Sequence, residues 1–78
     1  MKPHKFKRMA IDLIERVDTE GYRVEYSHNA IWFIHVSEKY PNGNKHLYLF
    51  NNTEDDKTLL MKFEKVKKVI SGEALIND

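Results

Sequence analysis

The sequence predicts one small α+β domain, residues 1–78, in which two helices cover one face of a three-stranded antiparallel sheet in the order α-β-β-β-α. Apolar residues recur at helical spacing near both ends of the chain. Between them lie three short segments rich in aromatic and β-branched residues, which are typical of strands. The chain has no cysteine, so ordinary packing without disulfides has to hold its core together.

The first helix is expected from about Pro3 to Thr19. Pro3 suits a first helical turn because its missing N–H needs no partner there, and Gly21 offers the left-handed residue that commonly ends a helix. One face of this helix is apolar, because its members recur at three- and four-residue steps. These residues are Phe6, Met9, Ala10, Leu13, Ile14 and Val17.

Three strands are expected at residues 22–27, 31–37 and 45–51. Asn42-Gly43 predicts a two-residue type I′ turn between the second and third, which would set Val36 opposite Leu49. A two-residue His28-Asn29 loop between the first and second would set Val24 opposite Phe33. We expect an odd loop or a bulge there instead, since it brings the first strand onto the core face of that hairpin.

Because side chains alternate along a strand, this register sorts them into two faces. The face expected to pack on the helices carries apolar residues, and we expect Leu13, Ile34, Leu49 and Phe63 to share one core. The core face consists of Trp32, Ile34, Val36, Leu47 and Leu49. The face expected to stay open carries three aromatic residues and two histidines, namely Phe33, His35, His46, Tyr48 and Phe50.

The second helix is expected to begin at Thr53, which with Asp56 is similar to a capping box. Gly72 provides its stop signal, and residues 73–78 are expected to lie against the body of the domain. The apolar face of this helix consists of Leu59, Leu60, Phe63, Val66 and Ile70.

The order α-β-β-β-α is shared with double-stranded RNA-binding domains, which carry a lysine cluster at the N-terminal end of their last helix to bind phosphates. In this chain that end reads Thr53-Glu54-Asp55-Asp56, with three acids where those domains have cations. Only the order of the elements is shared, and we assign no family from it.

No catalytic or metal-binding pattern stands out in the sequence. The only glycines, Gly21, Gly43 and Gly72, are accounted for by turns and helix ends, so no phosphate-binding loop is indicated. The four histidines fall on different elements or at different heights of the sheet, which is not the spacing of metal ligands. A domain of this size also has little room for a water-excluding cleft. We therefore expect no enzyme, no metal and no cofactor.

The charges nearly balance, with 13 Lys and Arg against 12 Asp and Glu, which argues against both a DNA-coating protein and an acidic mimic of nucleic acid. The cations concentrate in two patches near the ends of the chain, whereas the stretch between them is net negative. Such patches are usually solvated helix faces, and the alternative is contact with phosphates. The candidate contact residues are Lys5, Arg8, Lys62, Lys65 and Lys68.

No segment has the pattern of an export signal or of a bilayer-spanning helix, so we expect a cytoplasmic protein with no membrane partner. Lysine outnumbers arginine by ten to three, which is compatible with an origin in a phage or another mobile element.

The expected open face is the strongest functional clue. Its aromatic residues can anchor a protein contact, stack on unpaired bases, or be covered by the tail segment 74–76. We expect a small non-catalytic binding protein, an inhibitor or modulator that contacts a host protein or a protein–nucleic acid complex. The alternative is an RNA or single-stranded nucleic-acid binder that uses this face and the surrounding lysines. A homodimer joined through the same face is a further expectation.

Overall fold

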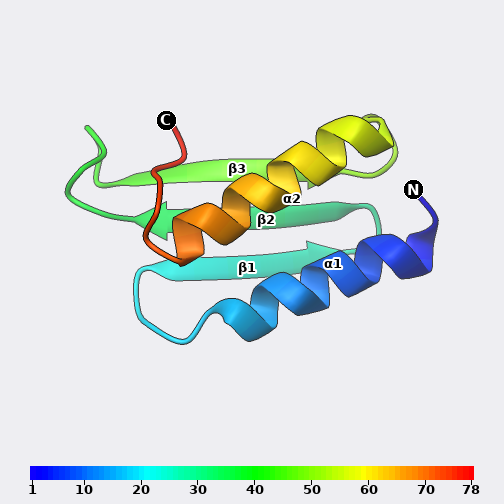
Figure 1. Cartoon of the computed structure of the whole chain (residues 1–78), viewed down its shortest axis with the longest axis horizontal. Coiled ribbons are helices and arrows are strands. Elements are labelled where there is room, and N and C mark those ends of the chain that lie inside the picture. Colours follow the sequence, from blue (N-terminus) through cyan, green and yellow to red (C-terminus); the bar gives the residue numbers. More distant parts are fainter.

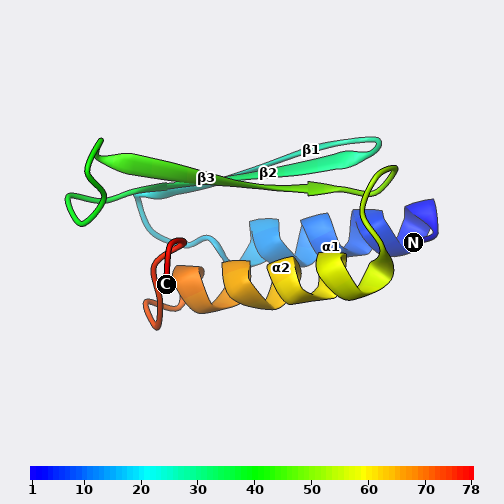
Figure 2. The same ribbon diagram turned by 90° about the horizontal axis from the view of Figure 1, so that it is seen from above.

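Two helices lie side by side on one face of a three-stranded antiparallel sheet in the computed structural model, which describes residues 1–78 (Figures 1 and 2). This confirms the predicted α+β fold and its element order. The sheet order is β1-β2-β3, and the face opposite the helices is left without cover (Figure 2). The elements are α1 (Pro3–Arg16), β1 (Tyr22–Ser27), β2 (Ala30–Val36), β3 (Asn44–Phe50) and α2 (Asp56–Ile70).

The core fills the space between the sheet and the helices. α1 contributes most of its predicted apolar stripe, although Ile14 is exposed. In α2 the predicted Leu59 and Val66 are buried, whereas Leu60 is 50% exposed and Val69, which was not predicted, is buried. The sheet contributes alternate residues of β2 and β3. The fully buried large side chains of the core are Phe6, Leu13, Ile31, Phe33, Leu49, Leu59, Val66 and Val69. Burial of one such side chain stabilises the fold by about 1.5–3 kcal/mol, so this cluster is the main source of stability.

The C-terminal end of α1 and the N-terminal end of α2 differ from the prediction. α1 ends at Arg16, before the predicted Thr19, because Val17 takes an extended conformation, and Ile14 is left 46% exposed. α2 begins at Asp56, and Asp55 is its N-cap: its side chain accepts a hydrogen bond from the Thr58 N–H at 2.8 Å. The capping box predicted at Thr53 was therefore placed too early.

The predicted type I′ turn at Asn42-Gly43 was wrong. That turn needs a positive φ at both central residues, and Asn42 does not have one, although Gly43 does. A longer loop follows β2, in which Tyr40 N–H donates to Ser37 O and Gly43 N–H to Tyr40 O. Ile31 consequently faces Leu49 across the β2–β3 ladder.

The expectation of an odd loop in the first hairpin was also wrong. The two-residue loop His28-Asn29 joins β1 to β2, and Val24 faces Phe33. Tyr22 and Tyr26 therefore lie on the same side of the sheet as Phe33, the side that the helices cover.

The register exchanges the two faces of β2. Ile31, Phe33 and His35 are buried beneath the helices, whereas Trp32, Ile34 and Val36 point away from them. Ile34 is therefore not a core residue, contrary to the prediction. β3 keeps its predicted orientation, since Leu47 and Leu49 face the helices while His46, Tyr48 and Phe50 face outward.

Candidate binding surface on the open face of the sheet

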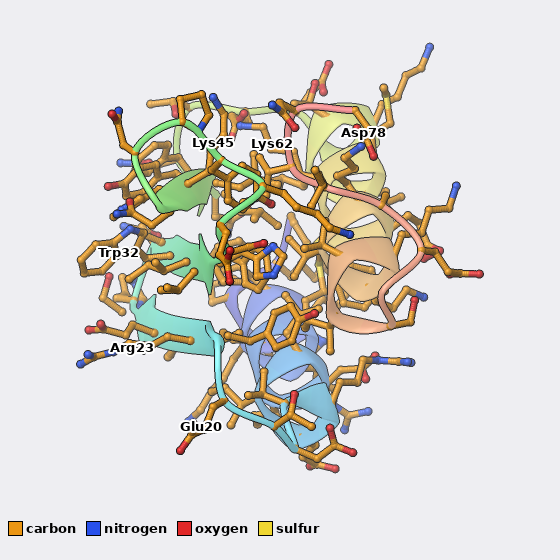
Figure 3. All side chains as sticks on the ribbon, turned by 90° about the vertical axis from the view of Figure 1, so that its left-hand side faces the viewer. Glu20, Arg23, Trp32, Lys45, Lys62 and Asp78 are labelled. Atoms are coloured by element: carbon orange, nitrogen blue, oxygen red, sulfur yellow. The ribbon has the colours of Figure 1, made fainter.

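The open face of the sheet carries a row of four ring side chains, Trp32, His46, Tyr48 and Phe50, which we call the ring row. Trp32 and Tyr48 face each other across β2 and β3, with ring centroids 6.0 Å apart and planes 5° from parallel. Tyr48 and Phe50 follow along β3 at 5.6 Å and 6°. Figure 3 shows Trp32 pointing away from the helical layer. The rings thus form one continuous apolar surface.

Hydrogen bonds fix one end of the ring row. Trp32 Nε1–H donates to His46 Nδ1 at 2.9 Å. Because Nδ1 accepts this bond, Nε2 is the ring nitrogen that carries a proton, and it donates to Asn44 Oδ1 at 3.1 Å. Trp32 is therefore held in one orientation by its neighbours on β3.

A shallow pocket of about 270 Å³ opens beside the ring row, at the end of the sheet where β1 turns into β2. Glu25 contributes the carboxylate of this pocket, and Arg23 Nε contacts that carboxylate at 2.8 Å. These two are the only strand residues of formal charge on the open face, and they neutralise each other. The pocket is lined by Glu25, Tyr26, Ser27, Ala30, Trp32, Tyr48 and Phe50.

Two predicted members of the open face belong to the core instead. Phe33 is fully buried and His35 is only 8% exposed, because the observed register turns the odd residues of β2 toward the helices. His46, Tyr48 and Phe50 do lie on the open face, with Tyr48 and Phe50 each 40% exposed. Trp32, which sequence reasoning assigned to the core, completes the ring row.

His35 takes part in a buried hydrogen-bond relay on the helical side. Its Nδ1 lies 2.7 Å from the Tyr40 hydroxyl, which accepts a bond from the Ile76 N–H at 3.0 Å. The hydroxyl proton is then available to His35 Nδ1. Burial, and next the positive charge of Lys39, hold the pKa of His35 below its ordinary value. Burial therefore favours the neutral form of His35, whose Nδ1 can accept the hydroxyl proton of Tyr40.

The same relay places the C-terminal tail. Ile76 packs against the core, and the tail lies on the helical side of the sheet (Figure 2). Lys65 Nζ also donates to the Asp78 carbonyl at 2.9 Å. The tail therefore does not cover the ring row, which removes internal cover as an explanation of the exposed aromatic residues.

The predicted basic patches belong to α1 and α2, which form the layer on the other side of the sheet from the open face (Figure 2). Lys5, Arg8 and Lys68 are exposed there, whereas Lys62 and Lys65 are engaged within the chain. Of these five cations only Lys62 meets the ring row, at the outer edge of β3, where its Nζ donates to Tyr48 O and is paired with Glu54.

Lys62 and Glu54 form an ion pair against the outer edge of β3. Lys62 Nζ donates to Tyr48 O at 2.8 Å, and Glu54 Oε1 accepts from Phe50 N–H at 2.7 Å. Burial alone would raise the pKa of Glu54, but the hydrogen bonds from Lys62 and Phe50 and the charge of Lys62 outweigh it, and this pKa is lowered. We call this arrangement the β3 edge clamp.

No family model, curated protein or solved structure matches this chain. Neither helix has the length and apolar character that crossing a membrane requires. No cluster of three or more His, Asp or Glu side chains is placed so that it could hold a metal ion. The open face is therefore the feature of this chain that bears on its function.

Proposed function

We propose that this protein is a non-catalytic binding module that acts by covering part of a partner protein with the open face of its sheet. The ring row carries the proposal, because neither the helices nor the C-terminal tail cover it. Large aromatic side chains, with tryptophan and tyrosine foremost, are the residues that most often anchor protein contacts. Trp32 and Tyr48 supply one of each at the centre of this face.

The charge distribution favours a protein partner over a nucleic acid. Proteins that bind single strands combine stacking rings with cations that follow the phosphate backbone. Here Arg23 is paired with Glu25 and Lys62 with Glu54, and the other candidate cations belong to the helices, which cover the opposite face of the sheet (Figure 2). A nearly neutral aromatic surface suits the apolar centre of a protein interface.

We infer the biological setting of this protein from the size and composition of its chain. A small domain with an open aromatic face, for which we propose no catalytic role, fits the inhibitor or modulator class that phages and other mobile elements direct at host proteins. The absence of cysteine fits a reducing compartment, so we place its action in the cytoplasm.

The test compares two double variants that remove similar apolar groups from opposite sides of the molecule. Tyr48→Ala with Phe50→Ala removes half of the ring row, whereas Leu60→Ala with Met61→Ala removes exposed apolar groups of α2. Partners enriched by the unmodified protein should be lost with the first variant and kept with the second. For a purified partner we expect the first variant to raise Kd about 30-fold or more.

Unchanged thermal melting of both variants shows that folding is intact. A partner that the ring-row variant still retains would overturn the proposal. A partner that nuclease removes, or a Kd that rises steeply with salt, would assign the face to nucleic acid instead.

A further inference from the structure

The two outer edges of the sheet differ in how their backbone groups are used. Asn51 N–H donates to Asn29 O, so the odd residues of β3 bond to β2 and the even ones point outward. Two of these outward groups, Tyr48 O and Phe50 N–H, are occupied by the β3 edge clamp. These bonds close the Tyr48–Phe50 half of the β3 edge to another strand.

The backbone groups on the outer edge of β1 are not blocked in this way, although α1 runs beside this edge on the helical side (Figure 1). Val36 N–H donates to Gly21 O, so Arg23 and Glu25 bond toward β2, and the backbone N–H and C=O groups of Tyr22, Val24 and Tyr26 point outward. No side chain and no other segment of the chain makes a hydrogen bond to these groups. Three alternate residues therefore present a free edge that can take another strand.

We propose that the strand that takes this place is β1 of a second copy of the chain. The two strands run antiparallel about a twofold axis at Val24, so that Tyr22 of each copy faces Tyr26 of the other. Three hydrogen-bonded residue pairs then supply about six backbone bonds. The product is one continuous six-stranded sheet with all four helices on the same side.

Charge complementarity on the open face selects this occupant and this register. With Val24 on the axis, Arg23 of each copy stands opposite Glu25 of the other, at the close, non-hydrogen-bonded positions of the ladder. Each copy already brings these two side chains within 2.8 Å of one another, so they can exchange partners without leaving the surface. A slip of two residues would instead set Arg23 against Arg23 or Glu25 against Glu25, which is unfavourable.

An apolar hollow beside the same edge supports the pairing. It has a volume of about 320 Å³ and is lined by Ile14, Val17, Tyr22, Arg23 and Val24. Ile14 is among the most exposed large apolar residues of α1, since α1 ends soon after it. Val24 and Tyr26 of the second copy would bring apolar side chains to this hollow, on the helical side of the joined sheet.

The first experiment measures self-association together with amide hydrogen exchange. We expect dimers in analytical ultracentrifugation, and slower exchange of the Tyr22, Val24 and Tyr26 amides as the protein concentration rises. The outward amide of His46 in β3 is the internal control, and its exchange should not change with concentration.

A charge-swap cycle tests the partner and the register. Arg23→Glu or Glu25→Arg alone sets two like-charge pairs across the axis and should raise the dimer Kd about tenfold or more. The double variant Arg23→Glu with Glu25→Arg restores opposite charges and should return Kd to within about threefold of the original. Lys68→Glu, exposed on α2, is the matched single reversal and should leave the dimer unchanged.

Three results would overturn the inference: a chain that stays monomeric at about 1 mM, a dimer whose β1 amides gain no protection, or a double swap that does not restore pairing. A dimer that is lost with Tyr48→Ala and Phe50→Ala would place the contact on the ring row instead. Because the β1 edge and the ring row are different surfaces, failure of this inference leaves the proposed function standing, and the reverse also holds.

Discussion

At the scale of single residues, the core and the open face are separated by one step along β2. Phe33 is fully buried, whereas its neighbours Trp32 and Ile34 point outward. His35 is the one polar side chain in the buried set, and it is satisfied by Tyr40. The cost of a substitution in β2 should therefore alternate along the strand.

Leu13 and Ile34 form a matched pair that measures this separation. Leu13→Ala leaves a cavity in the core and should lower the free energy of unfolding by about 2–5 kcal/mol. Ile34→Ala removes a similar group from the open face and should cost less than about 1 kcal/mol. Urea denaturation of both variants checks this, and equal losses would contradict the observed register.

The buried His35 predicts a loss of stability in mild acid. Its pKa is lowered by burial and by Lys39, so the unfolded chain takes up this proton more readily than the folded one. As far as His35 is concerned, the free energy of unfolding is highest above the ordinary pKa of 6.5. It declines as the pH falls from 6.5 toward the lowered pKa of the folded state. We expect His35→Gln to flatten this part of the stability profile.

Thermal or urea unfolding between about pH 5 and 7.5 measures the profile. His28→Gln, on the exposed β1–β2 turn, is the control and should keep the slope of the unmodified protein. A slope that survives His35→Gln would assign the proton uptake to another group.

At the scale of the elements, the helices and the three strands could be predicted from the sequence, and their pairing could not. The apolar spacing of α1 and α2 fixes which side of each helix is buried, and the structure confirms this for Phe6, Leu13 and Val66. The register depends on loop geometry, which one dipeptide does not determine. Asn42-Gly43 is typical of a type I′ turn, yet burial of Tyr40 under the sheet favours a longer loop.

The candidate site was predicted only in part, because the strand register decides which side chains lie on the open face. His46, Tyr48 and Phe50 keep their side because the parity of β3 was right, while Phe33 and His35 exchange places with Trp32. The sequence feature that would have placed Trp32 on the open face is the two-residue loop His28-Asn29. That loop aligns Tyr22, Val24 and Tyr26 with Phe33 as a second apolar row, and the other face of β2 is then the open one.

The turns that set this pairing depend on two glycines with positive φ. Gly43 has φ 80° and open space around it, so Gly43→Ala should cost about 1–2 kcal/mol from backbone strain alone. Gly21 has φ 97°, and an added Cβ would lie 3.3 Å from the Val36 carbonyl. We therefore expect Gly21→Ala to lower the midpoint of thermal unfolding further than Gly43→Ala, and the opposite order would contradict this account.

At the scale of the whole molecule, the helical side and the open face of the sheet carry different groups. The helical side carries the exposed lysines and the bound C-terminal tail, and the open face carries the ring row. Joining two β1 edges would leave both ring rows on one side of the enlarged sheet, because the twofold axis is perpendicular to it. A partner with two equivalent sites could then gain affinity from contacting both at once.

When two copies join through their β1 edges, the β3 edge clamp prevents a third copy from adding at β3. A molecule whose sheet has two free edges can add further copies at both of them without limit. A molecule with one free and one blocked edge forms a dimer and adds no further copies. Lys62→Met with Glu54→Met removes both the donor to Tyr48 O and the acceptor of the Phe50 N–H, and it keeps side chains of similar length. We expect light scattering to show that this variant grows into long oligomers, and that adding Tyr22→Pro, which places a ring without an N–H on the β1 edge, stops the growth again.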